Sequence, residues 1–397
     1  MRIGLYGGTY DPVHRGHMSA ALAAIGELKL DRLLLIPAAT PPHKQAGETE
    51  ARHRLAMLQI AAENLQRTDV ELCTLELERG GTSYTADTVR LLSEKYPNDE
   101  LFLLMGTDML ESFSSWARPR EILRAVTLCA FGRNESDSEE SLRRAADDIR
   151  ARFENARVHT FCNPHLIEIS STAVRHALAE GKGAEYLEPA VYGYILRHGL
   201  YGTKADMKHL PLALLRPVAL SFLKGKRVPH VLGTEETAAK LAERYGADET
   251  AARRAALLHD CTKKLTREEQ MSLFELYGLS SDEWERNGSK LLHARTGAAI
   301  AADLFGEPPE VTDAIRWHTT GRPAMTLLEK IVYLADYIEP NRDFPGVEDV
   351  RRAAWQDLDG AIALGLSMTV EELRESGLPV HPDTENALAY LKGTMKK

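Results

Sequence analysis

Residues 2–28 read RIGLYGGTYDPVHRGHMSAALAAIGEL, and this stretch decides the fold of the first half of the chain. The apolar run 3–6 is followed by Gly7 and Gly8, and residues 15–28 are rich in Ala and Leu at helical spacing. A buried strand that leads through a glycine turn into a helix is the start of a βαβ unit. The sequence therefore predicts an α/β organisation at the N-terminus.

Strand-like and helix-like segments continue to alternate along the first half. Such alternation is typical of parallel strands joined by helical crossovers, so we expect an α/β doubly wound parallel sheet of the Rossmann type. The further strands are expected at 32–37, 101–105, 126–131 and 158–161, and the further helices at 52–64, 86–95, 171–179 and 188–197.

The second half shows helical patterns alone. A chain of 397 residues exceeds the size of a single core, so at least two domains are expected. The pattern changes where Gly202 and small polar residues interrupt it. We expect an α/β domain at 1–200, a linker at 201–209 and an all-α domain at 210–397. Its expected helices are 235–244, 250–258, 267–277, 289–305, 309–318, 327–338 and 384–392.

Composition and charge exclude several classes of protein. Hydrophobic residues at 44% and charged residues at 27% are ordinary globular values, which excludes a mainly disordered chain. A formal charge of −9 argues against binding a nucleic-acid polymer. No apolar run approaches the roughly 20 residues that span a bilayer. We expect a soluble cytoplasmic protein with no membrane partner, and the oligomeric state is left open.

The first candidate site is the turn between the first strand and the first helix. Gly7 and Gly8 let the backbone approach a ligand closely. The N-terminus of the following helix favours an anion, and His14 and His17 on its first turn can donate hydrogen bonds to phosphate oxygens. Nucleotidyl transfer needs these parts, because the protein must orient two anions and neutralise growing charge. Two surface histidines on a loop would be the alternative.

A second phosphate-binding candidate lies at ISSTAVR, residues 169–175. Ser171 or Thr172 can cap a helix whose first N–H groups point at phosphates. Arg175 follows on the first turn and can make charge-assisted hydrogen bonds. A capped helix without a ligand is the alternative for this segment taken alone.

The helical half contains spaced histidine and aspartate residues. Adjacent residues project about 100° apart on a helix, so the doublet after the apolar helix suits one metal-bound imidazole and one bridging carboxylate. Imidazole and carboxylate without thiolate suit iron, manganese or a similar divalent metal better than structural zinc. Lys263, four residues after the histidine of the doublet, would share its helix face and could reach a phosphate. The candidate ligands are His230, His259, Asp260, His293, His318 and Asp336.

The first half resembles a known family on these motifs. GGTYDPVHRGH together with ISSTAVR is similar to the nucleotidyltransferase superfamily that bears HxGH and ISSTxxR motifs. Within it, residues 1–200 resemble bacterial nicotinate-nucleotide adenylyltransferase, on PPHK at 41–44, GTSYT at 81–85, and GTD at 106–108 with Trp116. The family's usual GGTFDP has a phenylalanine where this chain has Tyr10.

The resemblance implies transfer of adenylate from ATP, with Mg²⁺, to nicotinate mononucleotide, giving deamido-NAD and pyrophosphate. It implies catalytic roles for His14, His17 and Arg175. It places nicotinate mononucleotide at Lys44, Thr85 and Trp116, with Trp116 stacking on the pyridine ring. Packing of Trp116 as a half-buried aromatic is the alternative. The residues implied to bind ATP are Gly7, Gly8, Thr9, His14, His17, Gly106, Asp108, Ser171, Thr172 and Arg175.

The second half resembles the HD-domain phosphohydrolase superfamily and, within it, the bacterial symmetrical bis(5′-nucleosyl)-tetraphosphatase. The resemblance rests on VPHVLGT, HDCTKK, HARTG, WHTTGR and, above all, YLADYIEPNRDFPGVEDVR. It implies a di-metal centre, with iron expected, held by the six candidate ligands, and Lys263 as a catalytic residue. It implies hydrolysis of diadenosine tetraphosphate, a dinucleoside polyphosphate, to two ADP.

Two alternatives stay open for the helical half. It could hydrolyse another nucleotide, such as a guanosine alarmone. It could instead be a nucleotide sensor that regulates the first domain without turnover. Presence of all six candidate ligands argues against the sensor.

Overall fold

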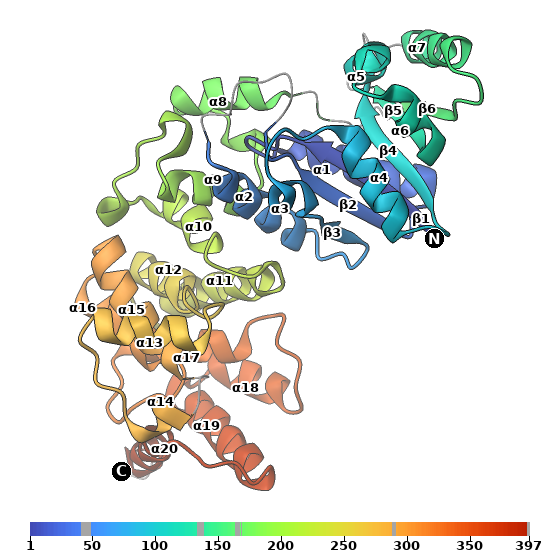
Figure 1. The fold of residues 1–397 in the computed structure, drawn as a ribbon. Coiled ribbons are helices and arrows are strands. Elements are labelled where there is room, and N and C mark those ends of the chain that lie inside the picture. The colour runs from blue at the N-terminus through green and yellow to red at the C-terminus, as the bar shows by residue number, and fades with distance from the viewer. Residues whose placement is uncertain (41–48, 133–138, 163–166, 168, 288–290, 395–397) are drawn as a thin grey trace. The chain divides into compact units, whose positions relative to one another are not determined.

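The computed structural model describes residues 1–394 except 41–48, 133–138, 163–166, 168 and 288–290. The chain folds into two compact units. One contains residues 1–195 with 199–203, and the other contains residues 196–198 with 204–397 (Figure 1).

The first unit is built on one six-stranded sheet in the order β3-β2-β1-β4-β5-β6. Every pair of neighbouring strands is parallel, which confirms the predicted doubly wound sheet. The short strand β3 at the sheet edge is not among the strands expected from sequence. The strands are β1 (Arg2–Gly8), β2 (Arg32–Pro37), β3 (Val70–Leu72), β4 (Glu100–Gly106), β5 (Val126–Gly132) and β6 (Val158–Cys162).

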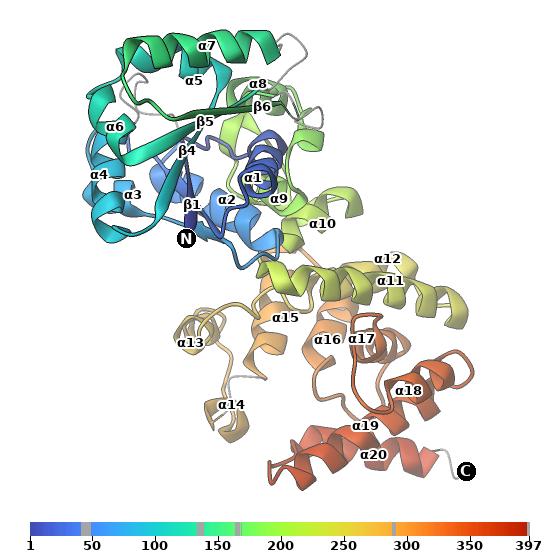
Figure 2. The ribbon, with the colours of Figure 1, turned by 90° about the vertical axis from the view of Figure 1, so that its right-hand side faces the viewer.

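Helices cover both faces of this sheet (Figure 2). On β2, Leu33 and Leu35 belong to the core cluster that contains residues of α1, α2, α8 and α9, whereas Leu34 and Ile36 belong to the cluster that contains residues of α4, α5, α6 and α7. Alternate side chains of a strand point to opposite faces, so continuous apolar strands require two helical layers. The helices are α1 (Arg15–Leu28), α2 (Ala51–Asn64), α3 (Leu75–Arg79), α4 (Thr85–Lys95), α5 (Thr107–Ser112), α6 (Pro119–Ala125), α7 (Glu139–Arg152), α8 (Ser171–Ala179) and α9 (Pro189–Arg197).

The strand order reverses between β1 and β4. The two strands pair in register through Leu5 and Leu103, so their carboxyl ends lie at the same edge of the sheet. Ligands of open α/β sheets bind at such a reversal point. The histidine motif follows β1, and Gly106 and Asp108 lie where β4 ends and α5 begins.

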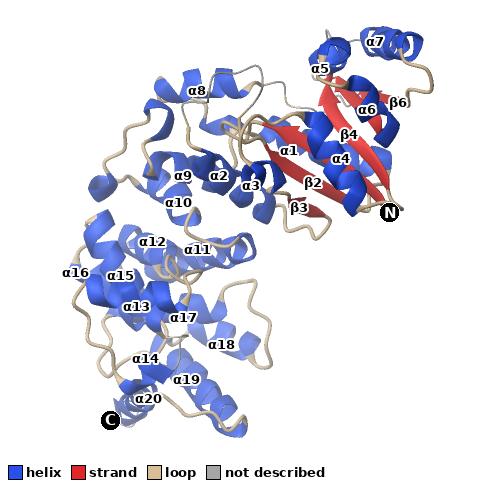
Figure 3. Ribbon diagram, viewed as in Figure 1, coloured by secondary structure: helices blue, strands red, loops and turns tan. Residues whose placement is uncertain are grey.

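Within the described residues, the second unit contains helices and no strand, as predicted (Figure 3). Helix α11 begins seven residues earlier than expected, because its proline lies in the first turn, where proline is tolerated. Helices α10, α14, α18 and α19 are not among those expected from sequence. The helices are α10 (Leu212–Leu220), α11 (Val228–Tyr245), α12 (Glu249–Leu258), α13 (Arg267–Leu276), α14 (Glu283–Asn287), α15 (Leu292–Phe305), α16 (Pro309–Trp317), α17 (Leu327–Ile338), α18 (Val347–Ala354), α19 (Leu358–Glu375) and α20 (Pro382–Thr394).

A core of alanine and aliphatic residues from α11, α12, α17, α18, α19 and α20 holds the second unit together. Ala256 on α12 and Ala335 on α17 are fully buried there. Small side chains let these helices approach closely, which brings together the polar residues at their ends. Along the described chain, none of the helices combines the length and apolar character that crossing a membrane requires.

Candidate active sites

The first site is built around two histidines where α1 begins. His14 is buried at the helix N-cap, and its backbone N–H donates to Nδ1 of His17 at 3.3 Å. The two imidazole rings lie with centroids 3.7 Å apart. Both rings border a small hollow that Gly16, Phe131 and Ile169 also line. The arrangement places two hydrogen-bonding rings beside the N-terminus of a helix, which favours an anion.

Gly16 makes this arrangement possible. A Cβ atom at this position would lie 2.7 Å from the backbone oxygen of Ile167 and 3.0 Å from Nδ1 of His14. Gly7 differs, since a Cβ there would meet no atom of the described residues within 4 Å. The glycine of HxGH therefore serves packing, whereas Gly7 borders open space at the end of β1.

Tyr10 replaces the phenylalanine of the related family without leaving its hydroxyl unpaired. The side chain is 1% exposed, and its hydroxyl donates to the backbone oxygen of Tyr6 at 2.7 Å. The ring packs edge-on against His17 with centroids 5.1 Å apart. A buried hydroxyl with a partner costs little, so the substitution fits the site.

The two predicted phosphate motifs meet in space. Ser171 Oγ donates to the backbone oxygen of Pro12 at 3.0 Å, and Arg175 Nη1 donates to that of Asp11 at 2.7 Å. Arg175 also donates to Thr172 Oγ1 at 3.2 Å. The expected cap at Ser171 or Thr172 was wrong, because Ser170 is the N-cap and accepts from the third residue of α8. Ser171 is therefore available to bind the segment from Gly7 to His14, which we call the glycine loop.

Two further side chains hold the glycine loop, and sequence reasoning missed both. Buried Arg54 donates to the backbone oxygens of Thr9, at 2.7 Å, and Ala39, at 3.0 Å. Tyr201 donates to Asp11 Oδ1 at 2.6 Å. Neither residue is near the loop in sequence, so local pattern could not identify them. Tyr201, the first residue of the expected linker, thus packs on the first unit.

The residues implied to bind adenosine and the pyridine side lie at or near the ends of strands and helices of the first unit. Gly106 ends β4 and Asp108 is exposed on the first turn of α5. Thr85 begins α4. Trp116 is half-buried and packs on Phe113, with ring centroids 5.4 Å apart. Packing alone therefore explains part of the Trp116 position.

Lys44, expected at the mononucleotide phosphate, lies outside the described residues. An ion pair of 2.8 Å between Asp87 and Arg118 joins the start of α4 to the loop after Trp116. This contact lowers the pKa of Asp87, because the guanidinium donates a hydrogen bond to the carboxylate. The ion pair connects the segments that carry Thr85 and Trp116.

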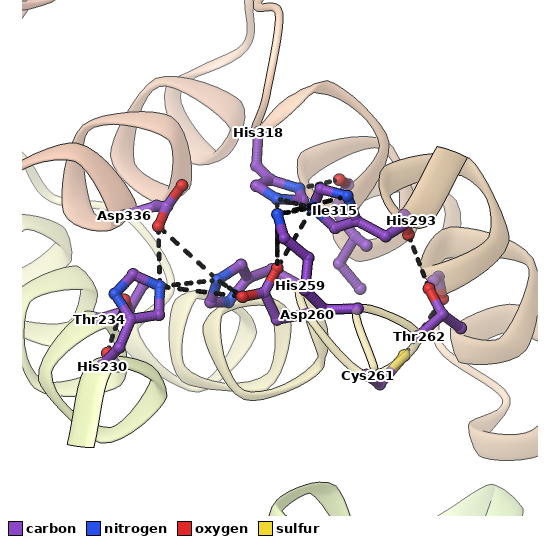
Figure 4. Close-up of polar contacts among 12 residues, drawn as sticks. His230, Thr234, His259, Asp260, Cys261, Thr262, His293, Ile315, His318 and Asp336 are labelled. Carbon is purple, nitrogen blue, oxygen red and sulfur yellow. Dashed lines mark hydrogen bonds and ion pairs between the residues drawn. The ribbon is translucent and has the colours of Figure 1, made fainter. Parts of the chain in front are cut away.

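The second site is a buried cluster that unites all six predicted ligands (Figure 4). The six residues form three overlapping groups, and within each group the ligand-type atoms lie within 4.8 Å of one another. The groups are His230 with His259 and Asp260; His259 with His318 and Asp336; and Asp260 with His293 and His318. The two oxygens of Asp260 face different neighbours. Oδ2 lies 3.5 Å from His259 Nε2, whereas Oδ1 lies 3.2 Å from His293 Nε2.

The doublet follows α12, as expected, but the helical geometry assumed for the doublet and for Lys263 was wrong. Helix α12 ends at Leu258, and His259, Asp260 and Lys263 lie in the tighter turns that follow. Lys263 N–H donates to the backbone oxygen of Asp260 three residues earlier, at 2.9 Å. Lys263 nevertheless reaches the cluster, with Nζ 2.9 Å from His293 Nε2. The turn therefore brings together residues that an ideal helix would have placed differently.

Hydrogen bonds at the outer nitrogens orient the imidazoles. His259 Nδ1 donates to the backbone oxygen of Ala256 and His318 Nδ1 to that of Ile315, both at 2.6 Å. These bonds fix the tautomer that leaves Nε2 facing the cluster. His230 Nδ1 donates instead to the buried carboxylate of Glu339, at 3.0 Å.

The protonation states of the cluster suit metal coordination at every ligand with a shifted pKa except His259. Burial disfavours the charged form of His259, but Asp260 and Asp336 outweigh it and raise the pKa, so a metal ion would have to displace that proton. Burial lowers the pKa of His293 and His318. Burial opposes ionisation of Asp260 and Asp336, but the neighbouring His259 and His230 outweigh it and hold both pKa values well below the ordinary value. Metal ligands must be neutral imidazoles and ionised carboxylates. The residues present therefore fit a centre for divalent metal ions with nitrogen and oxygen ligands, in which Asp260 faces both halves.

Sequence reasoning missed three charged residues at this cluster. Glu339 and Arg342 belong to the EPNRD segment, to which the sequence pattern assigned no role. Arg342 Nη2 donates to Asp336 Oδ1 at 2.7 Å, and Arg227 Nε donates to Asp260 Oδ2. Their spacing from the ligands follows no simple motif, although the polar EPNRD run after an apolar helix was a usable signal.

Two family models match separate parts of the chain, one in each half. Residues 5–177 match the family described as cytidylyltransferase-like, and residues 227–341 match the HD domain family. The first half is 34% identical over 202 residues to a probable nicotinate-nucleotide adenylyltransferase of Borrelia hermsii, covering 51% of this chain and 98% of the relative.

The second half is 46% identical over 174 residues to a symmetrical bis(5′-nucleosyl)-tetraphosphatase of Halalkalibacterium halodurans, covering 44% of this chain and 90% of the relative. Among solved structures, a predicted HD superfamily hydrolase involved in NAD metabolism from Clostridium acetobutylicum matches with 38% identity and a TM-score of 0.45. That match covers 47% of this chain and 98% of the other.

Proposed function

We propose that this chain, which belongs over its first half to the nicotinate-nucleotide adenylyltransferase family and over its second half to the family of symmetrical bis(5′-nucleosyl)-tetraphosphatases, is a bifunctional enzyme of nucleotide metabolism. One observation supports each activity. In the first unit it is the contact between the HxGH loop and the ISSTxxR helix. In the second it is the six-residue cluster around Asp260.

In the first reaction, the phosphate of nicotinate mononucleotide attacks the α-phosphorus of ATP. A new P–O–P bond forms, the bond to the β-phosphate breaks, and pyrophosphate leaves with the electron pair. The attacking phosphate is already ionised, so the protein mainly orients the two anions and stabilises charge. His14 and His17 would donate to the phosphates, and Ser171, Thr172 and Arg175 would hold the triphosphate end beside the same loop. Mg²⁺ bound with ATP would offset further negative charge.

Recognition of the two nucleosides would take place at the carboxyl edge of the sheet. Gly7, Gly8 and Thr9 would approach the ATP phosphates, and Gly106 and Asp108 the adenosine. Thr85, Trp116 and Lys44 would bind nicotinate mononucleotide.

The first activity is tested by pyrophosphate release from ATP with either nicotinate or nicotinamide mononucleotide. The expected result is release with the nicotinate compound, deamido-NAD as product, and at least about tenfold lower kcat/KM with the nicotinamide compound. Release with neither compound would contradict the proposed activity, and equal rates would contradict the proposed preference.

In the second reaction, water cleaves a P–O–P bond of diadenosine tetraphosphate. A new P–O bond forms, the bridging oxygen leaves with the electron pair, and each product is ADP. His230, His259, Asp260, His293, His318 and Asp336 would hold a pair of divalent metal ions. Iron is the proposed native metal on the resemblance to the tetraphosphatase family; the imidazole and carboxylate ligands fit it and fit manganese as well. When bound, the ions supply an acidified water and charge stabilisation. Lys263 would contact a phosphate oxygen.

The second activity is tested on the full chain by metal analysis combined with product analysis. Two ADP per diadenosine tetraphosphate are expected, together with bound iron. ATP and AMP as products would contradict symmetrical cleavage. Preferential turnover of a guanosine alarmone would support the alternative substrate, and tight nucleotide binding without product would support a sensor.

A further inference from the structure

Three side-chain cations contact the same atoms that face the centre of the second site. Arg342 Nη2 donates to Asp336 Oδ1 at 2.7 Å, and that oxygen lies 2.9 Å from His230 Nε2. Arg227 Nε donates to Asp260 Oδ2. Lys263 Nζ lies 2.9 Å from His293 Nε2 and 3.7 Å from Asp260 Oδ1.

These contacts compete with metal coordination. A metal ion held by His230, Asp260 and Asp336 would draw on the carboxylate charge that now attracts the two arginines. The same holds for Lys263 beside His293 and Asp260 Oδ1. The cations would then stay close to the centre, while the metal would neutralise much of the negative charge of the Asp260 and Asp336 carboxylates that they contact.

Arg227 and Arg342 are only partly saturated by protein acceptors, and what distinguishes them is that their acceptors are the cluster carboxylates Asp260 and Asp336. Arg216 and Arg322 also leave Nη1 without a protein acceptor among the described residues, but they pair with Glu235 and Glu329 instead. Arg254 donates to both carboxylate oxygens of Glu307, at 2.6 and 2.9 Å, as structural bidentate pairs do. Arg227 donates through Nε alone, and Arg342 donates through Nε and Nη2, so within the described residues Nη1 of each makes no hydrogen bond to protein. Both guanidinium groups thus keep donors for a further anion.

The cations lie between the buried ligands and solvent. The side chains of Arg227, Arg342 and Lys263 are 27%, 33% and 38% exposed, whereas that of Asp260 is completely buried. Arg342 also borders an open hollow of about 600 Å³ lined by residues 340–352. The lining of this hollow also includes the carboxylates of Asp343, Glu348 and Asp349. The three cations are nevertheless more accessible to an anion from solvent than the buried carboxylate of Asp260.

We propose that Arg227, Lys263 and Arg342 form a phosphate-binding rim that selects a substrate with charged phosphate groups on both sides of the cleaved P–O–P bond. Arg227 and Arg342 lie beside the half of the cluster at Asp260 Oδ2 and Asp336, and Lys263 lies beside the half at Asp260 Oδ1. A polyphosphate chain crossing the cluster would contact both groups, and a phosphomonoester only one. The inference rests on the proposed hydrolase and adds the residues that would bind the phosphates on both sides of the cleaved bond.

The rim is tested by calorimetric binding of a non-hydrolysable methylene-bridged analogue of diadenosine tetraphosphate to the metal-loaded full chain. Arg227→Gln and Arg342→Gln are each expected to weaken binding about ten- to hundredfold, because each removes a charge-assisted hydrogen bond to phosphate. Metal content per chain, measured on the same samples, is expected to stay at the wild-type value. Arg374→Gln is the matched control, since Arg374 pairs with Glu385 on the surface and contacts no cluster residue.

A second measurement separates selectivity from general damage. The ratio of kcat/KM for diadenosine tetraphosphate to that for p-nitrophenyl phosphate is expected to fall at least about tenfold in both glutamine variants. Arg342→Lys keeps the charge and is expected to recover part of the analogue affinity. It also replaces Arg342→Gln if circular dichroism shows that the glutamine variant is unfolded.

Unchanged analogue affinity in the folded, metal-loaded glutamine variants would overturn the rim. Loss of metal with unchanged affinity per loaded site would also overturn it, because the arginines would then serve only the cluster. If the wild type binds the analogue through the arginines but hydrolyses no nucleotide, the proposed hydrolase fails and the rim stands. If it hydrolyses the tetraphosphate and the variants match it, the rim fails and the hydrolase stands.

Discussion

The carboxylate of Glu339 contacts the ring of His230 on the side that faces away from Asp336. Oε1 of Glu339 accepts from His230 Nδ1 at 3.0 Å, while Nε2 on the other side of the ring lies 2.9 Å from Asp336 Oδ1. Oε2 of Glu339 accepts from both the backbone and the side chain of Asn341, each at 2.8 Å. Carboxylates behind metal-binding histidines fix the tautomer and raise ligand basicity. Gly233 leaves room for this carboxylate, because a Cβ there would overlap Oε2.

Glu339→Gln is expected to lower metal affinity about 10- to 100-fold, because the amide removes the charge behind His230. Competition with a calibrated chelator measures the affinity. Gly233→Ala displaces the same carboxylate without removing it, so it should change affinity in the same direction. Wild-type affinity in folded Glu339→Gln would show that the carboxylate does not support the metal site.

Asp260→Asn is expected to abolish tetraphosphate hydrolysis and to lower bound metal, since the two Asp260 oxygens face different halves of the cluster. Adenylyl transfer should persist at its wild-type rate, because the first site contains none of these residues. Both activities and the metal content are measured on one preparation. Loss of both activities in a folded variant would argue against independent sites.

His17→Ala is expected to lower kcat of adenylyl transfer about 10²- to 10³-fold, the usual effect of removing one donor to developing charge. Steady-state pyrophosphate release measures the rate. His159→Ala on β6 is the control, because that side chain is 43% exposed and pairs with Glu27. An unchanged rate in His17→Ala would exclude His17 from the catalytic step.

Gly16→Ala and Gly7→Ala should separate packing from ligand approach. Alanine at 16 meets the Ile167 oxygen and His14, so a loss of about 1–3 kcal/mol of stability is expected. Alanine at 7 meets no atom of the part of the chain that the structure describes, so the melting temperature of this variant should be unchanged while KM for ATP rises. Thermal unfolding and ATP kinetics check the pair. Equal destabilisation by both variants would contradict the difference in space around the two glycines.

Thiol labelling should divide the cysteines by burial. Burial raises the pKa of Cys129 and Cys261 to about 12, so both thiols stay protonated at about pH 8.5 and react slowly. Cys162 is exposed and should react first. Mass spectrometry after brief iodoacetamide treatment, with a denatured control, identifies the labelled residues. Rapid labelling of Cys261 in the native protein would show that the turn beside Asp260 opens.

The sequence predicted the elements whose signal is local. The bounds of β2 and α8 agree with the expected 32–37 and 171–179, because a buried apolar run and a polar start mark them clearly. Helix α19 was not predicted, because Gly360 and Gly365 weaken its helical pattern and tertiary packing stabilises the helix. Tertiary packing of this kind has no signature in a short window.

The candidate sites show the same limit. The six metal-type ligands were identified from the spaced histidine and aspartate residues of the helical half together with its resemblance to the HD-domain family. Arg227 reaches Asp260 across 33 positions of sequence, and Arg54 reaches Thr9 across 45. Contacts of this length depend on how helices and strands are arranged, and a single sequence without its fold carries no spacing rule for them.

The loop with both histidines is closed by residues that the ribosome makes much later. Arg175 binds the Asp11 backbone and Tyr201 binds its side chain, 164 and 190 positions downstream. Early strands and helices of the sheet can form while the chain is still growing. The loop acquires its last hydrogen bonds only after about half of the polypeptide has emerged. A nascent or truncated chain that ends before Tyr201 would therefore possess the whole sheet and still lack a finished nucleotide loop.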